Sequence, residues 1–135
     1  MDYKLELIVV PSVDLDRAKE FYTRAGFALD VDHSAGDFRV VQLTPPGSAC
    51  SIALMRSERA GSLSGLHLIV PDIELARAEL GERGVEVTGP YHFDQGAQRD
   101  GPDPGRADYS SFLAFSDPDG NGWLLQEVGH IAAGS

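Results

Sequence analysis

The chain contains four histidines, and imidazole is the side chain best suited to transfer protons near neutral pH. One of them, His67, lies within the apolar segment Leu66–Val70 (LHLIV), which is typical of a strand. His67 could act as a general acid or base toward a bound substrate. Alternatively, it is a buried histidine that forms a hydrogen bond with Gln126 or with a backbone carbonyl.

The segment His92–Asp108 (HFDQGAQRDGPDPGRAD) is polar and rich in glycine and proline, which predicts a long loop. Such a loop is often a lid or a binding loop, and sometimes a mobile insert. His92 could contact a ligand at the mouth of a cavity, or it could be solvated. Arg99 and Arg106 could bind a carboxylate or phosphate of a substrate, or they could balance the aspartates of the same segment.

The charge balance narrows the classes of partner. The chain has 135 residues, with 11 lysines and arginines against 21 aspartates and glutamates, so its formal net charge is −10. A protein this acidic is a poor match for the phosphates of nucleic acid or for an anionic membrane surface. We therefore expect neither nucleic acid nor a membrane as its main partner.

The single cysteine, Cys50, cannot form an intramolecular disulfide, and a cysteine-based zinc site would need more thiols. We expect Cys50 to be an inert thiol. No signal peptide is visible, and no apolar run approaches the roughly 20 residues that span a bilayer. These observations predict a cytoplasmic protein.

Two halves of the chain repeat one order of elements. Each half predicts a strand ended by proline, then a helix that begins at an aspartate and ends at a glycine, then three strands. In the first half the strands are predicted at Leu5–Val10, Phe27–Val31, Phe38–Leu43 and Ser51–Met55, around a helix between Asp14 and Gly26. In the second half they are predicted at Leu66–Val70, from Val85–Val87 onward, at Ser111–Phe115 and at Gly122–Val128, around a helix between Asp72 and Gly84.

Aligning Asp14 with Asp72 also aligns Gly26 with Gly84 without a gap. One such half would leave a sheet face uncovered, so the two copies are expected to pack into a single domain spanning 1–135. Its modules are about 4–57 and about 64–128, followed by a tail at 129–135.

Two motifs resemble the vicinal oxygen chelate superfamily of glyoxalases, bleomycin-resistance proteins and extradiol dioxygenases. They are VDLDRAKEFY at Val13–Tyr22 and DPDGNGWLLQE at Asp117–Glu127. The resemblance implies an α+β fold in which two tandem βαβββ modules form a cupped, mixed eight-stranded sheet with the helices outside. It also implies a ligand cavity inside the sheet and a homodimer.

Enzymes of that superfamily commonly hold a divalent metal with four side chains, two from each module. The resemblance places those four positions at Leu7, Ala53, Gly65 and Leu124. None of these residues offers a side-chain donor to a metal. We therefore expect the fold without the usual metal centre, and no cofactor.

The same mapping, combined with the alternation of side chains along strands, predicts the wall of the cavity. If Leu7 and Gly65 face inward, the wall is mainly apolar, with His67 and Gln126 as its polar groups. Its apolar side chains are Leu7, Val9, Met55 and Leu124. This composition is typical of a small-molecule site.

Three functions follow from this wall. The first is a metal-independent small-molecule binder that holds a drug or metabolite, preferably a cationic one. The second is a metal-independent lyase, isomerase or cyclase in which His67 is the acid or base and Gln126 polarises a carbonyl. The third is a metal-dependent lyase or dioxygenase with a different ligand set.

Overall fold

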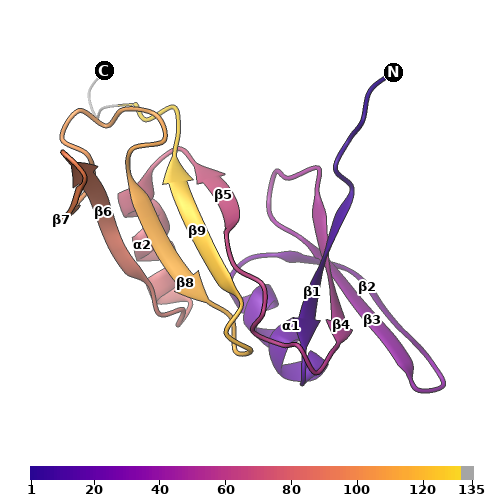
Figure 1. Cartoon of the computed structure of the whole chain (residues 1–135). Coiled ribbons are helices and arrows are strands. Elements are labelled where there is room, and N and C mark those ends of the chain that lie inside the picture. Colours follow the sequence, from indigo (N-terminus) through magenta and orange to yellow (C-terminus); the bar gives the residue numbers. More distant parts are fainter. Residues whose placement is uncertain (132–135) are drawn as a thin grey trace. The chain divides into compact units, whose positions relative to one another are not determined.

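The computed structural model describes residues 1–131 (Figure 1). The chain divides into two compact units. The first contains residues 1–64 together with 117–121, and the second contains 65–116 together with the chain from 122 onward. The last four residues of the predicted tail, 132–135, lie outside the described part.

The first unit is a four-stranded mixed sheet with one helix. The strands are arranged in the order β1-β4-β3-β2, with β1 parallel to β4 and the other neighbours antiparallel. The elements are β1 (Leu7–Ser12), α1 (Leu15–Arg24), β2 (Ala28–Ala35), β3 (Phe38–Thr44) and β4 (Ser51–Arg56). They confirm the predicted order of strand, helix and three strands.

The second unit repeats this plan with one additional strand. The strands follow the order β5-β9-β8-β6-β7, and β5 is parallel to β9 just as β1 is parallel to β4. The elements are β5 (Leu66–Val70), α2 (Ile73–Glu82), β6 (Thr88–Asp94), β7 (Ala97–Asp100), β8 (Phe112–Ser116) and β9 (Gly122–Glu127). The α+β fold with two tandem modules is therefore confirmed, with nine described strands in two hydrogen-bonded sheets.

Equivalent aspartates begin the two helices. The Asp14 carboxylate accepts a hydrogen bond from the backbone N–H of Arg17, and the Asp72 carboxylate accepts from the N–H groups of Glu74 and Leu75. These bonds satisfy backbone donors that have no partner within the first helical turn. Within the described residues, neither helix has the length and apolar character needed to cross a membrane.

Two predictions for the second half are wrong. Residues 85–87 are irregular, and the strand begins only at Thr88. The predicted loop at 92–108 instead contains the end of β6 and all of β7, which pair as a hairpin. Gln95 and Gly96 join the two strands, and both residues have positive φ. A two-residue turn needs this conformation if its backbone twist is to match that of the strands. All four side chains of β7 are exposed, so β7 lacks the alternation of apolar and polar residues that would reveal a strand.

The turn at 117–121 (DPDGN) belongs to the first unit, although it connects β8 and β9 of the second. The buried Asp117 carboxylate accepts hydrogen bonds from the backbone N–H groups of Asp119 and Asn121 and from the Asn121 side chain. It also accepts one from the hydroxyl of Tyr22 on α1, at 2.6 Å. The side chain of Asn121 donates to the carbonyl of Pro11 on β1. The turn therefore fastens α1 and β1 through buried polar bonds.

Replacing Tyr22 with phenylalanine removes one donor to a buried carboxylate and adds no bulk. We expect Tyr22→Phe to lower the free energy of unfolding by about 1–2 kcal/mol, measured by urea denaturation. Tyr109→Phe is the matched control, because Tyr109 is exposed. Equal stability of the two variants would contradict a stabilising role for the bond between Tyr22 and Asp117.

Candidate functional site

The two faces of the second sheet differ in burial. Side chains alternate along β9, so that Trp123, Leu125 and Glu127 are buried while Gly122, Leu124 and Gln126 are half-exposed. Helix α2 packs against β6, β8 and β9 and contributes the buried Ile73 and Leu80. The face that carries the half-exposed side chains of β9 is called here the open face.

The strand register defines the open face as two rows of residues. One row crosses the sheet from His67 through Leu124 and Ala114 to Thr88. The next row contains Ile69, Gln126, Phe112 and Tyr91. Neighbours within a row lie side by side on the same face of the sheet. The structure therefore brings together three of the predicted residues, which are His67, Leu124 and Gln126.

An open pocket of about 580 Å³ lies along the row that begins with His67. Its lining includes Gly65, His67, Glu86, Thr88, Ala114 and Leu124. The small residues Gly65 and Ala114 leave this part of the surface hollow. His67 and Leu124 line the pocket, whereas Gln126 lies two residues further along β9.

The imidazole of His67 is exposed and forms a hydrogen bond through Nδ1 with the backbone oxygen of Gly65, at 2.6 Å. A carbonyl oxygen only accepts, so Nδ1 carries the proton, and Nε2 is the acceptor in the neutral ring. Of the two bonding partners predicted for a structural histidine, the backbone carbonyl is observed and Gln126 is not. The interpretation of His67 as a buried structural histidine is wrong, because the residue is exposed.

Three aromatic rings form a cluster on the open face that was not predicted from the sequence. The rings of Tyr91 and Phe112 stack with their centroids 5.6 Å apart, and Phe93 packs edge-on against Phe112 at 5.7 Å. Phe93 is 54% exposed. The alternation of Tyr91 and Phe93 within YHFD is the sequence signal for this cluster, and it was hidden by the interpretation of the segment as a loop.

His92 alternates with these rings and therefore lies on the opposite face of β6. Its Nδ1 atom is within 2.8 Å of the backbone oxygen of Gly101, and the ring is half-buried. The register pairs His92 with Arg99 on β7. The structure thus separates His92 from the open face.

The predicted residues of the first unit also share one face of their sheet. The register pairs Val9 with Ala53 and places Leu7 and Met55 at alternate positions on the same side. On the other side, Val10 and Leu54 are fully buried. Leu7 and Val9 are exposed and Met55 is half-buried, in agreement with an apolar surface in this unit.

The four positions that the resemblance assigns to a metal carry no side chain that could bind one. Leu7 and Ala53 in the first unit and Gly65 and Leu124 in the second have no side-chain nitrogen, oxygen or sulfur. These four side chains therefore cannot hold a metal.

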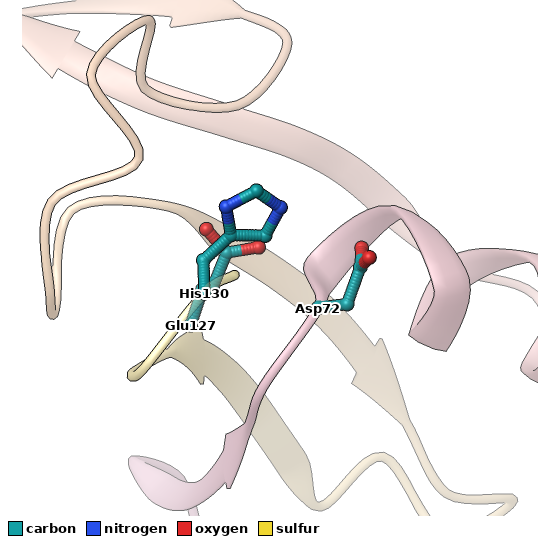
Figure 2. Close-up of side chains that lie close together, drawn as sticks. All are labelled: Asp72, Glu127 and His130. Carbon is teal, nitrogen blue, oxygen red and sulfur yellow. The ribbon is translucent and has the colours of Figure 1, made fainter. Parts of the chain in front are cut away.

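One other group of side chains has metal-binding chemistry. Asp72, Glu127 and His130 each place a potential ligand atom within 4.8 Å of the others, and no other such group occurs in residues 1–131 (Figure 2). Helix α2 begins beside Asp72, and Glu127 ends β9. This cluster lies at the helix-covered face and contains none of the predicted site residues.

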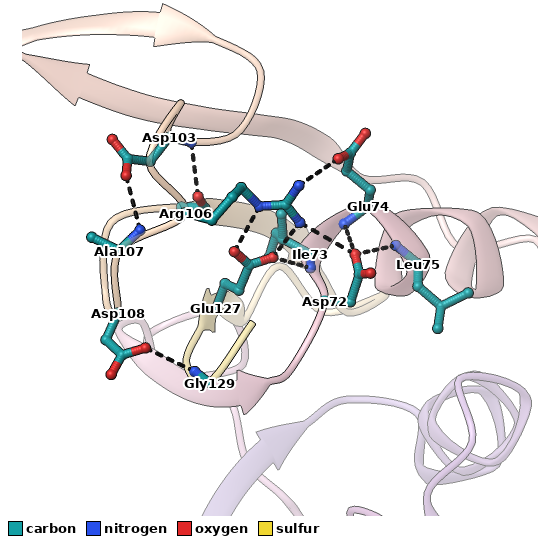
Figure 3. Close-up of polar contacts among 11 residues, drawn as sticks. Asp72, Ile73, Glu74, Leu75, Asp103, Arg106, Ala107, Asp108, Glu127 and Gly129 are labelled. Atoms are coloured by element: carbon teal, nitrogen blue, oxygen red, sulfur yellow. Dashed lines mark hydrogen bonds and ion pairs between the residues drawn. The ribbon is translucent and has the colours of Figure 1, made fainter. Parts of the chain in front are cut away.

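The guanidinium of Arg106 already pairs with the carboxylates of this cluster (Figure 3). It donates two hydrogen bonds to the Glu127 carboxylate, at 2.6 and 2.8 Å, and one to Glu74 at 2.7 Å. It also contacts Asp72 at 3.4 Å. The carboxylate oxygens therefore have a cationic partner within the chain, and the cluster does not fit a metal site. The interpretation in which Arg106 balances the aspartates of its own segment is therefore wrong, because its ion pairs run to Asp72, Glu74 and Glu127.

Glu127 is fully buried, and its bonds keep it charged. The hydrogen bonds from Arg106 hold the pKa of the Glu127 carboxyl below its usual value, against the opposite effect of burial. The backbone N–H of Ile73 also donates to this carboxylate, at 2.8 Å. The pKa of Asp72 is lowered as well, first by the backbone N–H of Leu75.

Replacing Arg106 with methionine would leave the Glu127 charge buried without its ion pair. We expect Arg106→Met to lower the free energy of unfolding by about 3 kcal/mol at neutral pH. Folding lowers the pKa of Glu127, so the ion pair stabilises the fold above the ordinary carboxyl pKa and less as pH falls. The difference between wild type and variant should therefore shrink in acid, as measured by chemical denaturation across pH.

Arg99→Met is the matched control, because Arg99 lies on β7 and is exposed. It should leave stability nearly unchanged at every pH. A loss in Arg106→Met that is independent of pH would contradict a role for the charge on Glu127.

Comparison with known proteins identifies the family of this fold. No model of a protein family matches the sequence, and no curated protein matches it. Among solved structures, TnmS3, an antibiotic-binding protein from Streptomyces sp. CB03234, is 33% identical, with a TM-score of 0.73. The match covers 93% of this chain and 96% of that one.

A glyoxalase/bleomycin resistance protein from the same Streptomyces strain is 34% identical, with a TM-score of 0.70, over 92% of this chain and 100% of that one. A member of the glyoxalase/bleomycin resistance protein/dioxygenase superfamily from Sphaerobacter thermophilus DSM 20745 is 28% identical, with a TM-score of 0.70. That match covers 94% of this chain and 98% of the other. With two relatives above 30% identity along nearly its whole length, the chain belongs to the glyoxalase/bleomycin resistance/dioxygenase superfamily, also called the vicinal oxygen chelate superfamily.

Proposed function

We propose that this protein binds a small organic molecule, a drug or a metabolite, on the open face of its second sheet and without a metal. The observation that carries the proposal is the pocket of about 580 Å³ lined by His67, Ala114 and Leu124. Its volume is within the range of pockets that hold drug-sized ligands. The likeness to an antibiotic-binding protein at 33% identity supports the same class of function.

The chemistry of the open face favours an apolar, partly aromatic ligand. Next to the row of His67, the rings of Tyr91, Phe93 and Phe112 form a contiguous aromatic surface. An aromatic side chain as exposed as Phe93 gains free energy when a ligand removes it from water. A few polar groups beside an apolar wall then fix the ligand's orientation.

The charges favour a ligand that carries a basic group. Glu86 is the only acidic residue in the pocket lining, and no lysine or arginine belongs to that lining. The formal net charge of −10 adds a long-range attraction for cations. The Nε2 atom of His67 supplies a hydrogen-bond acceptor for a ligand N–H or O–H group.

Binding can be tested with a panel of antibiotics and cationic natural products. We expect at least one compound to raise the melting temperature of the wild-type protein. Leu124→Arg should abolish the rise, because the longer charged side chain fills the pocket. Leu75→Arg on α2 should keep the rise, because Leu75 is an exposed residue of the helix.

The chelator EDTA should leave the ligand-induced shift unchanged. If no compound of a broad panel stabilises the protein, or if Leu124→Arg and Leu75→Arg respond alike, the open face is not the binding site. A shift that EDTA abolishes would instead indicate a metal-dependent function.

The geometry of His67 favours a second candidate function, a metal-independent lyase, isomerase or cyclase. The bond from Nδ1 to Gly65 fixes the ring and directs its basic nitrogen away from that carbonyl. A positioned base of this kind contributes about 100-fold or more to a proton transfer. Gln126 would assist only if the substrate reached the neighbouring row.

For a compound that the protein turns over, His67→Ala should lower kcat by about 100-fold while the ligand-induced rise in melting temperature persists. His33→Ala is the matched control, because His33 is an exposed residue of β2. Unchanged turnover in His67→Ala would remove His67 from the mechanism. If the wild type binds compounds but turns none of them over, only the binding function is supported.

A further inference from the structure

The sequence contains a single asparagine, Asn121, and a glycine follows it. Asparagine is a thermolabile residue, because the backbone nitrogen of the next residue can attack its side-chain amide. Glycine has no Cβ to obstruct that attack. Asn121 is the last residue of the turn at 117–121, and Gly122 is the first residue of β9. The most labile residue pair of the chain therefore lies in the turn that fastens α1 and β1.

The fold holds every polar group of Asn121, which is fully buried. Its side-chain amide donates to the carbonyl of Pro11 at 2.9 Å and to the Asp117 carboxylate at 2.8 Å, so both amide hydrogens are used. Its side-chain oxygen accepts from the backbone N–H of Leu63, at 3.4 Å. Its backbone N–H and carbonyl are both bonded to Asp117. The attack requires Cγ of Asn121 to rotate toward the nitrogen of Gly122, and these bonds prevent that rotation while the turn is closed.

We infer that Asn121 is a modification site that reacts only when the turn at 117–121 opens, and that its modification prevents the turn from closing again. In the opened chain the nitrogen of Gly122 bonds to Cγ of Asn121, the bond between Cγ and Nδ2 breaks, and the amide leaves as ammonia with the proton of the Gly122 N–H. Water then opens the cyclic imide at either of its two carbonyl carbons. One product is aspartate, and the other is isoaspartate, in which the main chain runs through Cγ. The inference is independent of ligand binding at the second sheet.

Either product lacks the donor that the closed turn requires. In aspartate an oxygen replaces Nδ2, and it would face the carbonyl of Pro11 and the carboxylate of Asp117 with no hydrogen to donate. Acceptors and like charges brought together in a buried site without donors are strongly unfavourable. Isoaspartate also lengthens the main chain by one carbon, which displaces the backbone groups that bond to Asp117. A molecule that reacts while its turn is open therefore does not regain the native turn.

The dependence on opening is tested by the rate at which the amide of Asn121 is lost. The full chain would be incubated at mildly alkaline pH, in buffer and in guanidinium chloride, and the peptide that contains Asn121 would be analysed by mass spectrometry. The loss should be roughly 100-fold or more slower in buffer, because the native turn opens rarely. Tyr22→Phe should react about tenfold faster than the wild type in buffer, because it removes a bond to Asp117. In denaturant, where no turn is formed, the two rates should be equal.

Tyr109→Phe is again the matched control, because Tyr109 is exposed, and it should react at the wild-type rate in both solutions. Equal rates of amide loss in buffer and in denaturant would overturn the inference, because the fold would then give Asn121 no protection. Equal rates for Tyr22→Phe and Tyr109→Phe in buffer would overturn it as well.

The consequence of the reaction is tested by refolding. Wild-type chains aged in denaturant should separate on dilution into unmodified molecules that recover the native urea midpoint and modified molecules that do not. Asn121→Asp, which reproduces one product, should lower the urea midpoint, and failure of this variant to fold would be the same loss in its extreme form. Gln98→Glu makes the same chemical change at an exposed residue of β7 and should leave the midpoint nearly unchanged. Equal midpoints for these two variants, or modified wild-type chains that refold as unmodified ones do, would overturn the inference.

Discussion

A buried carboxylate at the end of β9 constrains the second unit. Glu127 is fully buried, and a charge in that position is tolerated only if hydrogen bonds replace the water it has lost. The guanidinium of Arg106 and the backbone N–H of Ile73 supply those bonds. The requirement fixes three segments at one point: the last residue of β9, the first residue of α2, and the loop between β7 and β8. Because α2 is held there, one face of the sheet is covered and the other is left open.

The contrast between the two faces explains how so small a unit has both a packed core and a hollow surface. The helix-covered face receives the larger buried side chains, such as Leu113, Leu125 and Trp123. The open face alternates with it and carries Ala114, Gly122 and Leu124, so the surface is hollow where two of these residues are small. Aromatic rings on β6 and β8 border the hollow. The packed face and the hollow face therefore both result from the alternation of side chains along each strand.

Local patterns made much of this arrangement predictable. The aspartates at positions 14 and 72 and the alternation in β9 depend on neighbours within a few residues, and the structure confirms the elements they indicated. Strand β7 was missed because all its side chains are exposed, so no apolar periodicity marks it. The pairing of Arg106 with Glu127 joins residues 21 positions apart, and nothing in the local sequence specifies which acidic residue an arginine will meet. The aromatic cluster was missed for a related reason, since Phe112 reaches Tyr91 only through the strand pairing.

The turn at 117–121 affects how the first unit folds and where the chain could be cut into fragments. The repeat is contiguous in sequence, but the first compact unit is not, since it includes a turn encoded after most of the second. A polypeptide that ended at Ser64 would retain Tyr22 and Pro11 without the buried residues that bond to them. During synthesis, the first unit therefore lacks part of its interior until the ribosome has passed Asn121. The halves are alike in plan, yet a fragment cut at their boundary is not a complete folding unit.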